Sequence, residues 1–382
     1  MFRSFFMAGF ECATGHNTHS QWIDQIEATQ HDVMIDHDYE LIAQAELFSA
    51  REAIRWPLVD RGGGRYDFST VQPVIEAALR RGIEPIWDLF HYGYPAGVDL
   101  YGAEFPGRFA AYCRAAAAFV QDQLPGPHYF TPVNEGSYFA WAAGERGLFA
   151  PHQRGRGHEL KIALARAAIA GIEAIRDVCP QARIVNVDPI CHVVPPAGSS
   201  REAQDGARHF NEHVVFQFLD MIAGKMHPEL GGSREHLDVV GLNYYWTNQW
   251  EVGREGTPLV DDDPRRVPLG ELVRSAWLRY GGDVLVSETG ALEDARAPWL
   301  DELADMSCTL LEQGVALRGV CLYPVLGMPE WHVREQWTRM GLWDLEPERE
   351  VLRRLPHLPM MQALRRAQHA VRQKRLALGQ PD

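Results

Sequence analysis

Two strand-like runs of the sequence end close to a glutamate. Residues 129–136 read Tyr-Phe-Thr-Pro-Val-Asn-Glu-Gly and contain Glu135, and residues 284–290 read Val-Leu-Val-Ser-Glu-Thr-Gly and contain Glu288. A pair of carboxyl groups held at the same end of a barrel is the minimum needed to cleave a glycosidic bond. Glu135 and Glu288 are therefore the first candidates for catalysis, provided that the fold brings them together.

The elements that must position them alternate along the chain. Apolar strand-like runs fall at residues 5–10, 49–56, 83–90, 128–133, 182–187, 237–242, 283–287 and 317–323. Helix-like segments fall at residues 39–48, 71–81, 105–123, 159–178, 208–222, 269–280, 299–313 and 360–375. Such an alternation is typical of a closed parallel barrel. The sequence predicts an α/β fold, a single (β/α)8 TIM barrel over residues 1–382.

The segment 71–81 shows the helical pattern most clearly. Apolar residues recur there at the three-and-four spacing of one buried face. Pro73 lies in the first turn and Gly82 follows the last residue, as is common at the two ends of a helix. In a barrel of this kind the active-site groups lie at the C-terminal ends of the strands. Glu135 follows the fourth predicted strand and Glu288 the seventh, so both are expected on the catalytic face.

Composition excludes several classes of partner. A chain of 382 residues with 46% hydrophobic content can bury a large core. Its formal net charge of −14 argues against nucleic acid and anionic membrane surfaces, because both would be repelled. A small carbohydrate or glycoside suits the chain better. We expect no signal peptide, because Glu11 interrupts the opening apolar run, and no membrane span, and therefore a cytoplasmic protein.

The cysteines and histidines do not indicate a metal. Six cysteines are scattered without a short paired spacing, so reduced and mostly buried thiols are expected. Histidines are frequent near the start, but no His-Glu-x-x-His or Cys-x-x-Cys spacing organises them. The sequence therefore predicts neither a metal nor another cofactor.

The two glutamates are expected to have unequal roles. Retaining glycoside hydrolysis needs one carboxylic acid to protonate the departing oxygen and one carboxylate, roughly 5 Å away, to attack the anomeric carbon. Strands four and seven lie across a barrel mouth from one another. Glutamate side chains that reach inward from both strands can bring their carboxyl groups to this separation. We assign Glu135 as acid/base and Glu288 as nucleophile. A lone glutamate at a strand end more often begins a loop or forms a salt bridge, so the assignment depends on the pair.

Further motifs, in their order along the chain, resemble glycoside hydrolase family 1, the retaining β-glucosidase-like enzymes of the (β/α)8 clan. They are Arg-Glu-Ala-Ile-Arg-Trp-Pro at 51–57, Gly-Ile-Glu-Pro at 82–85, Phe-His-Tyr at 90–92, Asn-Glu-Gly at 134–136, Gly-Leu-Phe-Ala-Pro at 147–151, Gly-Leu-Asn-Tyr-Tyr at 241–245, Ser-Glu-Thr-Gly at 287–290, Glu-Trp at 330–331 and Arg-Met-Gly-Leu at 339–342. The likeness runs from about Phe5 to Asp344.

The resemblance implies roles for the surrounding residues. Arg51 falls on the arginine that pairs with the nucleophile, and Tyr245 on the tyrosine that holds it; a cation and a hydrogen bond both keep a carboxylate ionised. Asn134 supplies an amide for the sugar 2-hydroxyl. Three more residues fall on substrate-binding positions: His91 on a sugar-binding histidine, Glu330 on a glutamate that grips the distal hydroxyls, and Trp331 on a tryptophan that stacks on the ring.

Two departures from the family fall in the sugar pocket. The first strand lacks the glutamine that holds the 3- and 4-hydroxyls, and either Glu11 or His16 is the candidate to replace it. Gly-Met-Pro at 327–329 stands where the family has an Asp-Asn-aromatic run. The sugar therefore stays open among glucose, galactose, mannose and less common residues, with 6-phospho sugars disfavoured, and neither the aglycone nor the oligomeric state is indicated.

Three other functions compete with hydrolysis. A non-catalytic sugar-binding barrel would keep the fold without turnover. A transglycosylase would use the same site to transfer the sugar to an acceptor alcohol, and an unrelated barrel hydrolase would use a metal. The retained carboxyl pair and its expected neighbours favour the retaining hydrolase.

Overall fold

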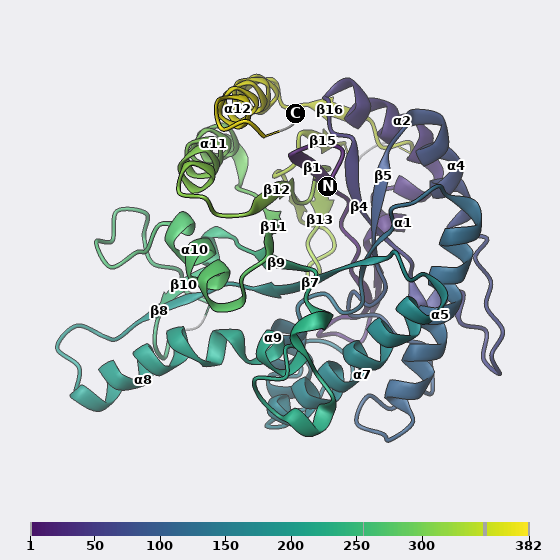
Figure 1. Ribbon diagram of the computed structural model, residues 1–382, viewed down its shortest axis with the longest axis horizontal. Helices are drawn as coiled ribbons and strands as arrows, with labels where there is room; N and C mark the ends of the chain where they lie inside the picture. Colours follow the sequence, from purple (N-terminus) through teal and green to yellow (C-terminus); the bar gives the residue numbers. More distant parts are fainter. Residues whose placement is uncertain (1, 255, 347–349, 381–382) are drawn as a thin grey trace.

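The computed structural model describes residues 2–254, 256–346 and 350–380, and a closed barrel of parallel strands lies at its centre (Figure 1). The barrel strands are β1 (Phe6–Gly9), β4 (Ser49–Ala53), β5 (Glu84–Asp88), β6 (Tyr129–Thr131), β7 (Arg183–Pro189), β9 (Val239–Asn243), β11 (Asp283–Thr289) and β12 (Leu317–Leu322). The barrel closes because β1 pairs with both β12 and β4. The predicted (β/α)8 fold is confirmed.

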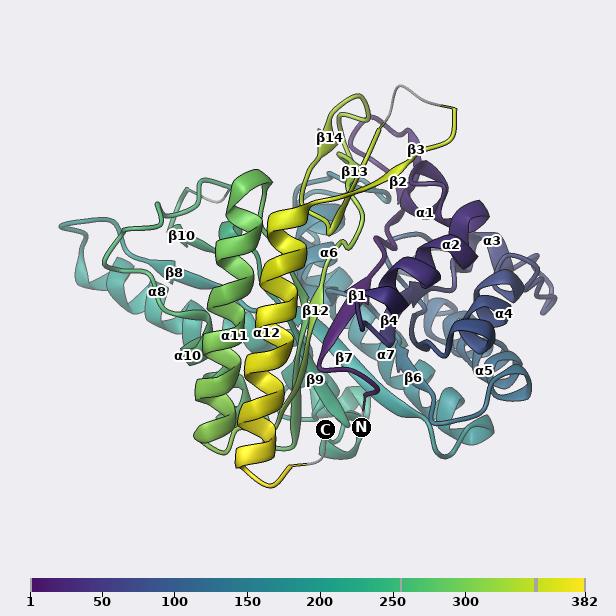
Figure 2. The ribbon, with the colours of Figure 1, turned by 90° about the horizontal axis from the view of Figure 1, so that it is seen from above.

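Helices surround this barrel. The longer ones are α2 (His31–Gln44), α4 (Gln72–Arg81), α5 (Phe105–Gln123), α7 (Gly157–Val178), α8 (Arg201–Glu212), α10 (Leu269–Tyr280), α11 (Arg296–Glu312) and α12 (Leu358–Ala377). The last two pack side by side along one flank (Figure 2). Across the described ranges, none of the helices is both long enough and apolar enough to span a bilayer.

Two layers of apolar side chains hold the barrel together. The inner layer fills the barrel and consists of Met7, Ile86, Tyr129, Val185, Val187, Val239, Leu285, Cys321 and Tyr323. The larger outer layer lies between the strands and the helices. Because side chains fill the interior, the barrel is a packed core and not a pore. The polar groups lie at the ends of the strands.

Local sequence signals place α4 as predicted. Its start has a proline in the first turn, and its end is Gly82 in the left-handed conformation, with φ of 69°. A residue with a Cβ is strained at that angle, which is why a glycine ends the helix there. The observed helix differs from the predicted 71–81 by one residue.

The first long helix lies earlier than the sequence pattern indicated. The sequence pattern predicts it at 39–48, whereas α2 spans His31–Gln44. Its buried face includes His31 and Asp38 beside apolar residues. Polar residues on the inner face conceal the apolar periodicity, so the first two turns were missed.

The segment predicted as one helix at 208–222 is divided. It contains the end of α8, a short 3-10 turn at Val214–Phe216, and α9 (Gln217–Ile222). Helix α8 packs against β8 (His192–Val194), which pairs with β10 (Gln249–Glu251) at the side of the barrel (Figure 1). This excursion leaves the barrel core intact.

Loops after the first and last barrel strands meet above the mouth. The hairpin of β2 (Thr14–His16) and β3 (Trp22–Asp24) lies beside the hairpin of β13 (Met328–Pro329) and β14 (Trp337–Thr338) (Figure 2). The Gln25 side chain donates to the Pro329 carbonyl at 3.1 Å, and Asn17 donates to the Trp331 carbonyl at 3.0 Å. The rebuilt segment 327–329 therefore belongs to this lid-like pair of hairpins.

A buried ionic network joins α2 to the barrel. His31 Nδ1 lies 2.8 Å from Asp38 Oδ2, and its Nε2 lies 3.1 Å from Glu52 Oε1. The ring stacks on Phe10 with centroids 3.7 Å apart. Burial disfavours the charged ring, but the two carboxylates outweigh it and raise the pKa of His31 to about 9. Both ring nitrogens therefore carry protons at neutral pH.

Replacing His31 with glutamine is expected to destabilise the fold in a pH-dependent way. The folded pKa lies above the ordinary value of 6.5, so the stabilisation is complete below pH 6.5 and is lost as pH rises through about 9. It amounts to at most about 3 kcal/mol. Urea unfolding at pH 6 and pH 9.5 should show a gap between wild type and variant that narrows at high pH. A gap independent of pH, or an equal effect of the exposed control His37→Gln, contradicts this prediction.

Candidate active site

Glu135 is presented by a sharp turn after β6. Its N–H donates to the Val187 carbonyl of β7 at 3.0 Å, and its backbone is left-handed, with φ of 51°. The short helix α6 (Gly136–Phe139) begins at once. A Cβ on Gly136 would lie 2.3 Å from the Phe218 ring. A glycine at this position allows Phe218 of α9 to pack directly against the turn. The strained backbone of Glu135 fixes the direction in which its side chain points.

Glu288 lies near the end of β11, at an irregularity of the sheet. The pairing of β11 with β9 shifts register between Val286 and Glu288, where Glu288 comes to lie opposite Asn243. A bulge of this kind re-aims the side chain that follows it. Glu288 is 4% exposed, so its carboxyl group must find partners inside the protein.

Arg51 is the central partner. It comes from β4, has no exposed surface, and donates through Nη1 to Glu288 Oε1 at 2.8 Å. Its Nη2 donates to Asp88 Oδ2 at 2.5 Å and to Asn134 Oδ1 at 3.0 Å. One guanidinium thus links the ends of three strands, and it balances two buried carboxylates.

Tyr245 completes the surroundings of Glu288. Its hydroxyl donates to Glu288 Oε2 at 2.9 Å, so each oxygen of this carboxyl group accepts a hydrogen bond. Glu135 is held differently: its Oε2 accepts from the Tyr92 hydroxyl at 2.7 Å. The positive charge of Arg51 therefore lies beside Glu288, not beside Glu135.

The electrostatics follow from burial and from these contacts. Burial raises the pKa of Glu135 to about 7, although the hydrogen bond from Tyr92 opposes the rise. Burial also raises the pKa of Glu288, to about 8; the neighbouring Glu135 adds to this rise, and the charge of Arg51 opposes it. Two close buried carboxyls titrate as a pair, so they share a single proton over the pH range between their two ionisations. Within the pair, the Arg51 ion pair lowers the pKa of Glu288 and so favours the charge there over Glu135.

His91 and Asn134 form the floor of the site. The Asn134 amide donates through Nδ2 to His91 Nε2 at 3.1 Å, because its oxygen already accepts from Arg51. His91 Nδ1 must then carry the ring proton, which it donates to Asp88 Oδ2 at 3.1 Å. In the free protein these groups satisfy one another, and a sugar hydroxyl would have to exchange with them.

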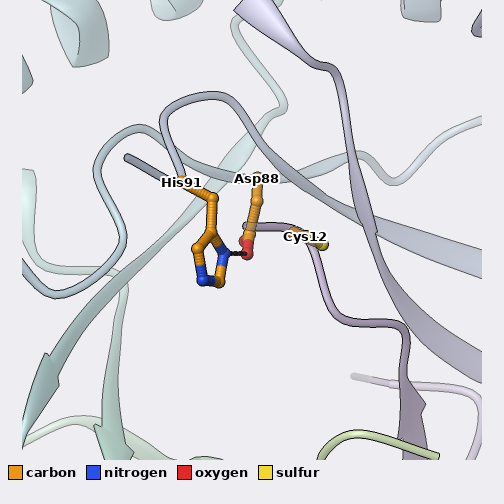
Figure 3. Close-up of side chains that lie close together, drawn as sticks. All are labelled: Cys12, Asp88 and His91. Atoms are coloured by element: carbon orange, nitrogen blue, oxygen red, sulfur yellow. Dashed lines mark hydrogen bonds and ion pairs between the residues drawn. The ribbon is translucent and has the colours of Figure 1, made fainter. Parts of the chain in front are cut away.

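Cys12, Asp88 and His91 lie close enough together to resemble a metal site (Figure 3). The hydrogen bonds argue against one. Asp88 Oδ2 already accepts from both His91 and the positive Arg51, which would repel a cation. Burial raises the pKa of the Cys12 thiol well above its ordinary value, so the thiolate that a metal needs does not form at neutral pH. The cluster fits an ion-pair network better than a metal.

The structure separates the two candidates for the missing glutamine. Glu11 is 6% exposed, and its Oε1 lies 3.6 Å from His91 Nε2. His16 is exposed and packs edge-on against Trp22 in the outer hairpin. Burial raises the pKa of Glu11 to about 7. Of the two candidates, only Glu11 therefore lies beside His91 in the candidate site.

Glu330 and Trp331 differ in how they face the site. Glu330 Oε2 accepts the N–H groups of His332 and Val333 at 2.6 and 2.8 Å, which leaves its other oxygen for a ligand. Trp331 packs among aromatic rings, 5.8 Å from Tyr92 and 5.7 Å from Phe149. Its buried indole N–H has no partner. Trp331 thus belongs to the aromatic wall beside Glu135.

Several residues of the site escaped the sequence analysis. Tyr92 was quoted as the end of a motif without a role, although it contacts Glu135 directly. Asn243 donates to Asn134 and accepts from Ser287, and Asp88 anchors both Arg51 and His91. Asp88 and Asn243 each end a barrel strand, and that position was the signal that would have found them.

A hollow of about 620 Å³ lies elsewhere on the molecule, on the outer surface between α10 and α11. It shares no residue with the site described above. The carboxyl pair lies within the barrel mouth, apart from this hollow.

The mouth of this closed (β/α)8 barrel holds two buried glutamates, and one of them is paired with an arginine. These are the groups that a barrel glycosidase needs. No protein-family model matches the sequence. The chain is similar in sequence to β-glucosidase A from Thermotoga maritima, with 22% identity over 364 residues that cover 78% of this chain and 80% of the relative. This match confirms the resemblance to glycoside hydrolase family 1, as a divergent sequence.

Solved structures of T. maritima β-glucosidase share the fold. One, described as a family 1 β-glucosidase, has a TM-score of 0.75 at 17% identity and covers 95% of this chain and 97% of its own. A complex with deoxynojirimycin has a TM-score of 0.76 at 17% identity, with 95% and 97% covered. A complex with glucoimidazole reaches 0.77 at 17% identity, with 96% and 98% covered. The barrel and its connections are therefore shared over nearly the whole length.

Proposed function

We propose that this protein is a retaining β-glycoside hydrolase that removes a terminal β-linked sugar, with Glu135 as acid/base and Glu288 as nucleophile. The observation that carries the proposal is the unequal treatment of two neighbouring buried glutamates. Each accepts a hydrogen bond from a tyrosine hydroxyl, but only Glu288 is also paired with the Arg51 guanidinium, whereas Glu135 lies beside an aromatic wall. Pairs whose surroundings favour different protonation states identify acid and nucleophile.

In the first step the Glu288 carboxylate attacks the anomeric carbon. Glu135 gives its proton to the glycosidic oxygen as the bond to the leaving group breaks. Arg51 and Tyr245 hold Glu288 in the ionised form and fix its direction before the attack. The products of this step are a glycosyl ester of Glu288 and a free alcohol.

In the second step the roles reverse. Esterification removes the negative charge of Glu288, which lowers the pKa of its neighbour and makes Glu135 a base. Glu135 takes a proton from water, the water oxygen bonds to the anomeric carbon, and the bond to Glu288 breaks. The released sugar keeps the original configuration because the carbon is inverted twice.

The substrate proposed is a small glycoside. His91, Asn134 and Glu11 line the polar floor, and Trp331 offers an aromatic face at the side. These groups suit an uncharged sugar with several hydroxyls. The six cysteines are all unpaired, which supports the proposal that the protein works in the cytoplasm.

A panel of nitrophenyl glycosides with α- and β-linked glucose, galactose, mannose, xylose and N-acetylglucosamine tests the proposal. We expect hydrolysis of at least one β-linked sugar, release of the β-anomer first by NMR, and no effect of EDTA. Sugar binding by calorimetry without hydrolysis of any member would favour a non-catalytic barrel. Transfer to an added alcohol in preference to water would favour a transglycosylase.

A further inference from the structure

Tyr92 is held rigidly beside Glu135. It follows β5 in a left-handed conformation, with φ of 76°, and its side chain is 2% exposed. Its ring lies parallel to Phe139 with centroids 5.4 Å apart, and edge-on to His91 at 4.7 Å and to Trp331 at 5.8 Å. Rings on several sides and a strained backbone leave the hydroxyl in one position.

The Tyr92 hydroxyl can only donate to Glu135. The two oxygens are 2.7 Å apart, and burial raises the pKa of Tyr92 well above its ordinary value, so the phenol keeps its proton. Glu135 Oε2 is therefore committed as an acceptor. When Glu135 is protonated, this hydrogen bond favours the proton on Oε1, because the carbonyl oxygen of a carboxylic acid is the better acceptor.

We propose that Tyr92 is a positioning residue that fixes which oxygen of Glu135 delivers the proton and stabilises the carboxylate that forms on delivery. The inference rests on the proposed function. The resemblance does not supply it, because it gives a role only to His91 of the Phe-His-Tyr motif. A hydrogen bond to the developing charge is stronger in the transition state than in the protonated ground state.

The effect of this bond depends on the leaving group. A poor leaving group needs the full proton from Glu135, whereas dinitrophenolate leaves without it. Tyr92→Phe keeps the packed ring and removes only the hydroxyl. We expect kcat/KM to fall about 10- to 100-fold for phenyl or alkyl glycosides and less than about threefold for dinitrophenyl glycosides.

The pH profile should change as well. Loss of a donor to the charged form raises the pKa of Glu135, so the basic limb of kcat/KM should move up by about one pH unit. The other charged or titratable groups that face Glu135 are Arg51 from β4, Tyr138 from α6, Asp188 from β7, Cys191 after β7, Tyr245 after β9 and Glu288 from β11. The substitution leaves all of them in place, so the shift reports the lost hydroxyl.

Tyr112→Phe is the matched control. Tyr112 is also a buried tyrosine, but its hydroxyl donates to the Ile54 carbonyl outside the site. Thermal unfolding of both variants separates folding defects from catalytic ones. The titration of the Glu135 carboxyl carbon by 13C NMR, assigned with Glu135→Gln, gives a reading independent of turnover, and it should show the same upward shift in Tyr92→Phe.

The outcomes separate the two claims. An active wild type with an equal loss for every leaving group, and no shift in the pH limb or in the NMR titration, overturns the role of Tyr92 alone. A wild type that hydrolyses no glycoside overturns the proposed function, and the NMR titration then still decides whether Tyr92 governs the protonation of Glu135.

Discussion

Replacing Glu288 with alanine is expected to lower kcat/KM on aryl β-glycosides by about 10⁵-fold. Alanine removes the proposed nucleophile, so the covalent route would be closed. Burial of the site excludes the bulk solvent that would otherwise substitute for it. Initial rates with the best nitrophenyl substrate measure the loss, and the exposed control Glu271→Ala should keep wild-type activity.

Two observations distinguish this loss from misfolding. Arg51 keeps Asp88 and Asn134 as partners in the variant, so the fold should survive with a modest drop in melting temperature. Added azide should occupy the space of the missing carboxylate and release the α-glycosyl azide, because a single displacement inverts the carbon. A variant that melts like wild type and keeps more than about one per cent of its activity would place the nucleophile elsewhere.

Replacing Glu135 with alanine is expected to produce a different pattern. Substrates with poor leaving groups should lose about 10³- to 10⁴-fold in kcat/KM, because general acid catalysis contributes about that much. Dinitrophenyl glycosides should still form the glycosyl ester quickly and then stall, because water lacks a base. A burst of dinitrophenol followed by slow turnover is the expected trace.

Azide identifies the role of Glu135. It needs no base, so it should restore turnover of the stalled ester and give the β-glycosyl azide. The two alanine variants should give glycosyl azides of opposite anomeric configuration, so each variant serves as the control for the other. An α-azide from Glu135→Ala, or equal losses for every leaving group, contradicts the assignment of acid and nucleophile.

The sequence predicted the barrel and most of its mouth for a clear physical reason. Parallel strands all end on one face of the barrel. Polar residues at the strand ends therefore come together regardless of the conformation of the loops. Hydrogen bonds join Arg51 to Asn134 and to Glu288, and Tyr245 to Glu288, and Glu135 lies close enough to Glu288 to raise its pKa. Their chemical roles stay predictions.

Other features depended on contacts that no local pattern encodes. The helix start at His31 is hidden because a buried charge network replaces apolar residues on its inner face. One carboxyl oxygen of Glu330 accepts a backbone N–H of its own loop. This contact depends on the conformation of the turn, which the Glu-Trp motif does not encode. The contact of Tyr92 with Glu135 needs two separate loops to fold correctly.

The most direct test of the account is covalent labelling with a 2-deoxy-2-fluoro β-glycoside of the preferred sugar and a dinitrophenolate leaving group. Fluorine slows both steps, and the activated leaving group lets the ester form and accumulate. Mass spectrometry of peptides from the inactivated protein should place one fluorosugar on Glu288, and Glu288→Ala should take up none. A label on any other residue, or no label while the wild type hydrolyses the parent glycoside, would contradict the account.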